Sequence, residues 1–192
     1  MKKRIKNKSI LNGIIIACVV NLLFLCSLFV CLAYGFNGVA FSIFITMLMI
    51  VYHTDVRIFI GVSLFLGLRK KMNIDNPCFK VGEKEFNRLN KLKVKKWKDK
   101  FVAWDRKQFV IRNGDNFQDN ISLVLKNNIN AEIIHWLCFF IGFFAIWIGC
   151  AISIDEWWIY LITSFVASFV CDLPPILIQR YNRFRLQKLR KK

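Results

Sequence analysis

Long runs of apolar residues without a charge constrain this chain more than any other feature of its sequence. The first run, Ile10 to Ala33, holds about 24 residues, and about 20 apolar residues in an α-helix cross the hydrocarbon core of a bilayer. The composition agrees, because 56% of the residues are hydrophobic and 19 residues are Phe, which is not typical of a soluble domain. The sequence therefore predicts a membrane protein.

The apolar runs predict an all-α fold with about four transmembrane helices in a single membrane domain. The spans are expected at residues 10–33, 39–68, 131–154 and 157–178 of the domain 1–192. The second run contains the polar island HTDVR, which is either part of one long helix or a loop between two shorter segments. The first run follows a basic start, and its length favours a retained span over a cleaved signal peptide.

The distribution of positive charge predicts the orientation of these spans. The net charge is +17, and Lys and Arg near the ends of spans stay on the cytoplasmic side. With four spans, the basic N-terminus, residues 69–130 and the tail 179–192 all fall on one side of the membrane. Both termini are therefore expected to be cytoplasmic. Because topology accounts for the charge, nucleic acid is not predicted as a partner.

The cytoplasmic segment carries an amphipathic pattern and ends in the loop signals NGDN and NNIN. EKEFNRLNKLKVKKWKDKF, from Glu83 to Phe101, spaces apolar side chains at helical intervals among lysines. This pattern predicts a basic amphipathic helix on an anionic leaflet, with Trp97 and Phe101 at headgroup level. The alternative is a helix with a solvated charged face.

Both histidines of the chain stand in patterns that suggest function. His53, Arg57 and Gly61 recur at intervals of four, so one helix face carries an imidazole, a guanidinium and a gap. Charged groups inside a membrane are costly and usually functional. His135 follows Glu132 by three, so the two side chains share a helix face, as a general base and its orienting carboxylate would. Alternatively, Glu132 favours the helix dipole and His135 belongs to an interfacial belt.

The end of the fourth run is unusually polar for a membrane anchor. Pro174 and Pro175 are expected to break the helical hydrogen-bond ladder beside Asp172. The residues that follow are donors for phosphate, carboxylate or sugar hydroxyls, and include more than the Lys and Arg that an anchor needs. These candidate binding residues are Gln179, Arg180, Tyr181, Asn182 and Arg183.

Several of these stretches together resemble the bacterial glycosyl-4,4'-diaponeurosporenoate acyltransferase family. They are VKKWKDK at 94–100, AEIIHW at 131–136, LPPILIQRYNRFRL at 173–186 and the YH-x3-R-x3-G run at 52–61. Two positions depart from the family pattern, with Phe184 in place of Pro and Asp172 in place of Asn. Members of this family are small integral membrane proteins, and the named activity esterifies a glucose hydroxyl of a carotenoid glycoside with a fatty acyl group.

The resemblance implies a multi-pass acyltransferase of the bacterial cell membrane that acts in carotenoid biosynthesis. Its expected partners are a lipid acceptor, an acyl donor and a bilayer with anionic lipids. We expect His135, oriented by Glu132, to deprotonate an acceptor hydroxyl that attacks an acyl thioester at the cytoplasmic leaflet. Arg180, Asn182 and Arg183 are the candidates for stabilising the oxyanion.

The remaining candidates are expected to bind the substrates. His53 and Arg57 would hold the acceptor head group, and Lys96, Trp97 and Lys98 would dock a phosphate of the acyl donor. The sequence shows no nucleophilic Ser motif or Cys/His pair, so direct transfer is favoured over an acyl-enzyme. Neither a metal nor a cofactor is predicted besides the acyl thioester co-substrate. The alternative function is a non-catalytic membrane protein whose basic face binds anionic lipid or a partner.

Overall fold

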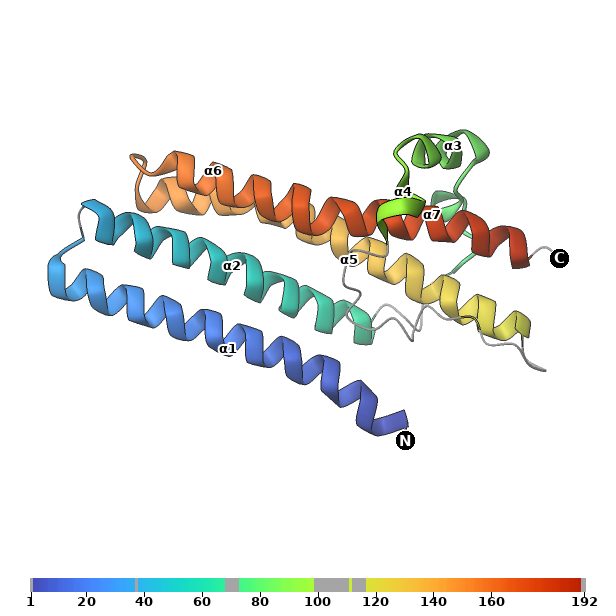
Figure 1. The fold of residues 1–192 in the computed structure, drawn as a ribbon, viewed down its shortest axis with the longest axis horizontal. Helices are drawn as coiled ribbons and strands as arrows, with labels where there is room; N and C mark the ends of the chain where they lie inside the picture. Colours follow the sequence, from blue (N-terminus) through green and yellow to red (C-terminus); the bar gives the residue numbers. More distant parts are fainter. Residues whose placement is uncertain (1, 37, 68–72, 99–110, 112–116, 191–192) are drawn as a thin grey trace. The chain divides into compact units, whose positions relative to one another are not determined.

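The computed structural model describes residues 2–36, 38–67, 73–98, 111 and 117–190, and their regular structure is helical throughout. Four of the helices are long and apolar enough to cross a membrane (Figure 1). They cover Ile14–Tyr34, Gly38–Ser63, Phe117–Ile152 and Trp157–Arg190. The prediction of an all-α protein with about four possible spans is confirmed.

The chain forms two compact units. Unit 1 comprises Met1–Phe59 and Cys138–Val170, and unit 2 comprises Ile60–Leu137 and Cys171–Lys192. Each unit therefore combines segments that lie far apart in the sequence, and helix α5 (Phe117–Ile152) contributes to both.

The first two helices of unit 1 form an antiparallel pair (Figure 1). Between helices α1 (Lys2–Tyr34) and α2 (Gly38–Gly67), Gly35 and Gly38 have positive φ, a conformation that glycine adopts without steric cost. Helix α2 runs unbroken through HTDVR. The interpretation of the second apolar run as one long helix is therefore confirmed, and the loop interpretation is wrong.

The core of unit 1 joins α2 to the second half of α5 and to α6 (Trp157–Val166). Its buried members are Ile45, Met49, Ala145, Ile159 and Tyr160. The helices approach most closely where Gly149 lies beneath the Tyr160 ring, because a Cβ added to Gly149 would stand 2.3 Å from Cγ of that ring.

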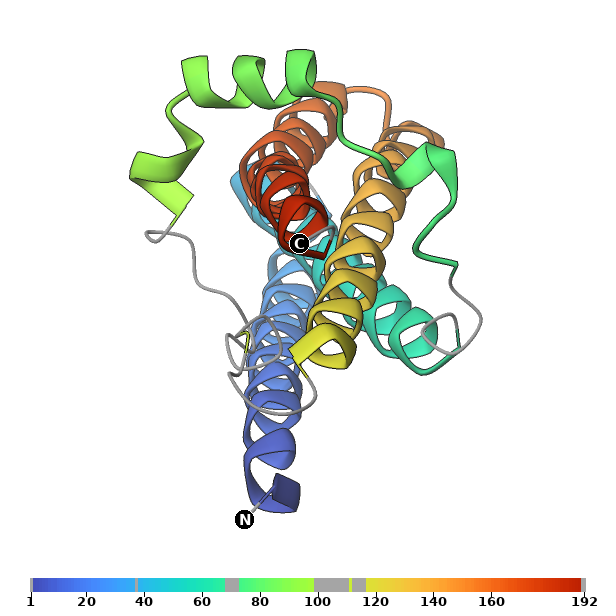
Figure 2. The same ribbon diagram turned by 90° about the vertical axis from the view of Figure 1, so that its right-hand side faces the viewer.

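Unit 2 places two short helices against α7 (Leu173–Arg190), as Figure 2 shows. These are α3 (Glu83–Lys91) and α4 (Val94–Trp97), separated by Lys93 with a φ of 54°.

The apolar residues of α3 and α4 pack on α7, where Leu89 and Val94 form a core with Tyr181. The single amphipathic helix predicted here is thus two helices, and their apolar residues contact protein. Phe101 lies outside the described residues.

Helix α5 begins 14 residues before the predicted start of the third span, at Phe117 instead of residue 131. The loop predicted at NNIN is therefore wrong, since these residues are helical and three of the four are buried asparagines. Asn tends to leave a helix when its amide bonds to the local backbone, but the amide of Asn128 bonds to side chains of α7 instead. NGDN lies outside the described residues.

The two prolines widen the helix instead of ending it. Pro174 and Pro175 lack the N–H groups that would bond to the carbonyls four residues earlier. The preceding residues, Ala167–Asp172, adopt a π-helical register, and α7 then continues from Leu173. A π-helical segment accommodates such a mismatch inside a continuous helix, so the predicted break of the ladder is a change of register.

The close approach at Gly149 predicts a large effect of one added methyl group. Gly149→Ala must displace the buried Tyr160 ring, and overpacking of this kind costs about 1–3 kcal/mol. We expect a clear fall in the thermal unfolding midpoint of the detergent-solubilised protein. The control is Gly61→Ala, where an added Cβ would meet nothing within 4 Å. Equal midpoints for the two variants would contradict the packing described here.

Candidate active site

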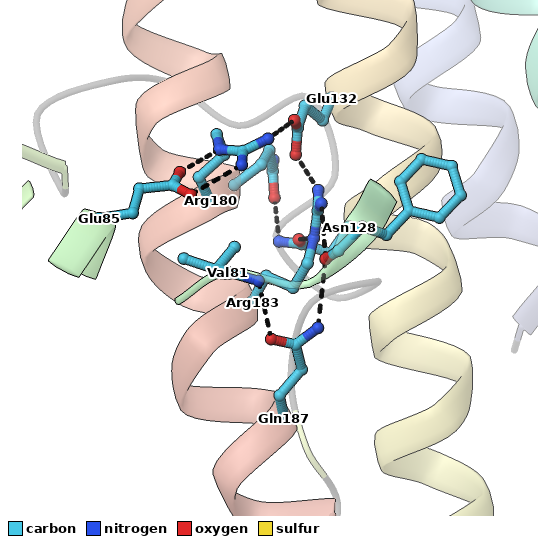
Figure 3. Close-up of polar contacts among 9 residues, drawn as sticks. Val81, Glu85, Asn128, Glu132, Arg180, Arg183 and Gln187 are labelled. Atoms are coloured by element: carbon cyan, nitrogen blue, oxygen red, sulfur yellow. Dashed lines mark hydrogen bonds and ion pairs between the residues drawn. The ribbon is translucent and has the colours of Figure 1, made fainter. Parts of the chain in front are cut away.

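A buried cluster of charges joins α3, α5 and α7 within unit 2, and Glu132 of α5 is its centre (Figure 3). One carboxylate oxygen of Glu132 accepts a hydrogen bond from Arg180 Nη1 at 2.7 Å. The other accepts a hydrogen bond from Arg183 Nη2. Only 6% of the Glu132 side chain is exposed. A buried carboxylate needs such partners, so both arginines of QRYNR neutralise Glu132.

Arg183 is fully enclosed by the protein, and each of its three nitrogens donates a hydrogen bond. Besides the bond to Glu132, Nε donates to Asn128 Oδ1 and Nη1 to the Phe79 carbonyl, both at 3.2 Å. Its side chain is 0% exposed. The guanidinium therefore connects α7 to α5 and to the turn Pro77–Phe79.

Arg180 uses its remaining nitrogens to hold α3. Its Nε and Nη2 donate to the two carboxylate oxygens of Glu85, a two-pronged arrangement that only a guanidinium provides. Gln187 adds a neutral link, because its amide donates to the Phe79 carbonyl and accepts from the Val81 N–H (Figure 3).

The structure pairs His135 with Asp172 instead of the expected Glu132. His135 Nδ1 lies 3.2 Å from Asp172 Oδ1. The Asp172 side chain is 0% exposed, whereas 31% of the His135 side chain is exposed. The expected pairing with Glu132 was possible by helix spacing, but the arginines of α7 bind both oxygens of that carboxylate.

The other predicted binding residues of unit 2 have mainly packing contacts. Tyr181 stacks on Phe86 with ring centroids 5.2 Å apart, and Lys98 Nζ lies 5.9 Å from the Tyr181 ring centroid. Trp97 Nε1 donates to the Leu92 carbonyl at 3.0 Å. Gln179 accepts a hydrogen bond from Asn128. The side-chain amide of Asn182 makes no hydrogen bond with any part of the chain that the structure describes.

The second polar group lies in unit 1 and contains the predicted residues His53 and Arg57. Arg57 Nη2 donates to the Ala167 carbonyl at 2.9 Å, where the π-helical segment begins. His53 Nε2 lies 3.4 Å from Ser164 Oγ. The small residue near His53 is Gly142, because a Cβ there would lie 3.4 Å from the imidazole Cε1. These contacts connect α2 with α5 and α6 inside unit 1.

Sequence reasoning missed three residues of the unit 2 site. Asn128 was assigned to a loop, Glu85 was not singled out within the amphipathic stretch 83–101, and Asp172 was noted beside the prolines without a partner. Only Asp172 had a usable signal, because a carboxylate within an apolar run requires a partner. Among the described residues no three His, Cys, Asp or Glu side chains gather as metal ligands.

These features define a small helical protein with four helices able to cross a membrane and a charged, histidine-containing site. The chain belongs to the glycosyl-4,4'-diaponeurosporenoate acyltransferase family, whose model matches residues 75–192. The family model covers the whole unit 2 site, and membership implies an acyltransferase that acts on a glycosyl carotenoid. No curated protein and no solved structure matches the chain.

The buried cluster predicts unequal effects for two glutamates. Glu132→Ala would leave two arginines without their shared carboxylate, and breaking a buried ion pair costs about 3–5 kcal/mol. Glu83→Ala removes an exposed pair with Lys188 at 3.4 Å, which is worth about 1 kcal/mol or less. Chemical denaturation of the two purified variants should show this difference. A Glu132→Ala variant as stable as Glu83→Ala would contradict a stabilising role of the buried charge cluster.

Proposed function

We propose that the chain is a membrane-embedded O-acyltransferase in which His135 is the general base and Asp172 positions it. The observation that carries this proposal is the pairing of a partly exposed imidazole with a fully buried carboxylate at 3.2 Å. A carboxylate that accepts a hydrogen bond from Nδ1–H fixes the orientation and the tautomer of the ring. Nε2 is then free of a proton and can act as the proton acceptor.

The transfer proceeds directly between donor and acceptor. His135 Nε2 takes the proton of an acceptor hydroxyl as its oxygen attacks the carbonyl carbon of the acyl thioester. The resulting oxyanion collapses, the carbon–sulfur bond breaks, and the protonated imidazole returns its proton to the leaving thiolate. Asp172 keeps its hydrogen bond with Nδ1–H and stabilises the imidazolium between these two proton transfers.

The arginine cluster has a positioning role in this mechanism. Arg180 and Arg183 were expected to contact the oxyanion, but in the structure each of their nitrogens donates to the protein. They hold α5, which carries His135, against α7. Asn182 of QRYNR stays the amide that the sequence predicts for the oxyanion contact, and we propose it for that role.

The substrates are assigned by the chemistry of the remaining residues. The acceptor is a glycosylated carotenoid or a similar lipid, and the binding of its head group by His53 and Arg57 of unit 1 stays a prediction from the sequence. Lys96, Trp97 and Lys98 dock the phosphate of the acyl donor, since ammonium groups bind phosphate as point charges. The reaction takes place at the cytoplasmic leaflet, where the basic segments lie.

Replacement of the proposed base is expected to abolish turnover without unfolding the protein. His135→Ala should lower the initial rate of acylated product formation about 10²- to 10⁴-fold. Asp172→Ala should cost at least about tenfold, because the ring loses its positioning partner. The measurement is mass spectrometry of lipid extracts from cells that make the glycosyl carotenoid.

The matched control for the carboxylate is Asp75→Asn. Asp75 is exposed and bonded to Arg190, which holds the pKa of that carboxyl below its ordinary value, and it takes no part in the reaction. Full turnover of His135→Ala, with the protein present in the membrane, would sink the proposed mechanism. It would favour a protein that binds lipid without catalysis.

The proposed orientation predicts which residues a membrane-impermeant thiol reagent reaches. In a background with the seven native cysteines replaced, Asp155→Cys should be labelled on intact cells. Asn90→Cys should be labelled only after the membrane is opened, because the basic segments keep this region cytoplasmic. Labelling of Asn90→Cys from outside intact cells would reverse the assigned topology.

A further inference from the structure

The acidic residues near α7 are already occupied by basic partners. Glu85 binds Arg180, Glu83 binds Lys188 and Asp75 binds Arg190. Among the described residues of unit 2, a group of cations without such acidic partners lies on α3, α4 and the turn between them. Its members are the exposed side chains Lys84, Arg88, Lys91, Lys93, Lys95 and Lys96, which we call the cationic face. None of them forms an ion pair with an acidic residue in the described part of the chain.

The packing of α3 and α4 leaves this face without an apolar anchor. Phe86, Leu89 and Val94 pack against α7, so they cannot enter a bilayer. Helices that lie on membranes bury an apolar face among the lipids, and here the large apolar side chain exposed within 83–97 is Leu92, in the turn between the two helices. The cationic face is therefore built for a polyanion and lacks what insertion requires.

The cationic face is also attached to the candidate active site. Glu85 of α3 accepts two hydrogen bonds from Arg180, and Arg180 also binds Glu132. Glu132 lies one helical turn before His135. Lys98, at the end of α4, lies over the Tyr181 ring of α7. A partner held by this face is thus held by the helices that position the proposed base.

We propose that the cationic face docks an acidic carrier protein that delivers the acyl group as a thioester. The proposal rests on the proposed acyl transfer, which requires an activated acyl donor. Helix α3 alone extends about 13 Å for its nine residues, and the cations continue through Lys93 onto α4. The few phosphates of a nucleotide-linked donor cover only part of such a row of cations, whereas an acidic protein surface can span the row and is steered toward it at low ionic strength.

Binding measurements on the full-length protein in zwitterionic nanodiscs test the proposal. The probes are a bacterial acyl carrier protein loaded with a hexadecanoyl group, hexadecanoyl-coenzyme A, and vesicles of phosphatidylglycerol. The variant Lys91→Gln/Lys95→Gln/Lys96→Gln removes three charges of the cationic face. The matched control, Lys80→Gln/Lys126→Gln/Arg185→Gln, removes three charges from elsewhere in unit 2.

We expect the loaded carrier protein to bind the wild type, more weakly as salt is added. The Kd should rise at least about tenfold in the cationic-face variant and less than about threefold in the control. Loss of coenzyme A or vesicle binding alone, with carrier binding unchanged, would overturn the proposal. No acceptor is present, so the result is independent of catalysis. If loaded carrier binds but transfers nothing when the acceptor is supplied, the proposed function fails and the docking surface stands.

Discussion

A guanidinium that solvent does not reach must be surrounded by acceptors, and Arg183 imposes this requirement on unit 2. Its three nitrogens donate to Glu132, Asn128 and the Phe79 carbonyl. Removing the charges of Arg183 and Glu132 from water costs several kcal/mol per ion. Only well-placed hydrogen bonds on all sides of both groups offset this cost. The arrangement therefore selects one register of α7 against α5 and the turn at Phe79. A displaced register would leave a buried charge without its acceptors.

The proposed chemistry depends on that register, because the base and its carboxylate come from the same two helices. His135 lies on α5, one turn beyond Glu132, and Asp172 immediately precedes α7. The hydrogen bond between them forms only when the helices align as the arginines hold them. On α5, the residue with a structural role, Glu132, and the proposed base, His135, thus lie on neighbouring helical turns. This division explains why Glu132, despite its ideal spacing from His135, serves the arginines and leaves the imidazole to Asp172.

The sequence predicted what depends on local pattern and missed what depends on partners. Span number and helical class follow from apolar run lengths, and the unbroken α2 shows that the four polar residues of HTDVR do not end a helix in apolar surroundings. The helical NNIN stretch was missed because the amide of Asn128 bonds to side chains of α7 that lie 51 and 55 residues further along the chain, and local propensity carries no such information. QRYNR was recognised as polar beyond the need of an anchor, but its main acceptors, Glu85 and Glu132, could not be assigned without the fold.

The saturation of Arg180 has a thermodynamic consequence for α3. Each of its nitrogens donates to Glu85 or Glu132, so an anionic molecule can reach this guanidinium only by exchange with one of them. Glu85 is the more accessible, with 34% of its side chain exposed against 6% for Glu132. An incoming anion and Glu85 of α3 therefore compete for the same nitrogens of the Arg180 guanidinium. Binding of the anion and docking of α3 on Arg180 therefore oppose each other. The factor by which the bound anion weakens the docking of α3 equals the factor by which docked α3 weakens the affinity for the anion.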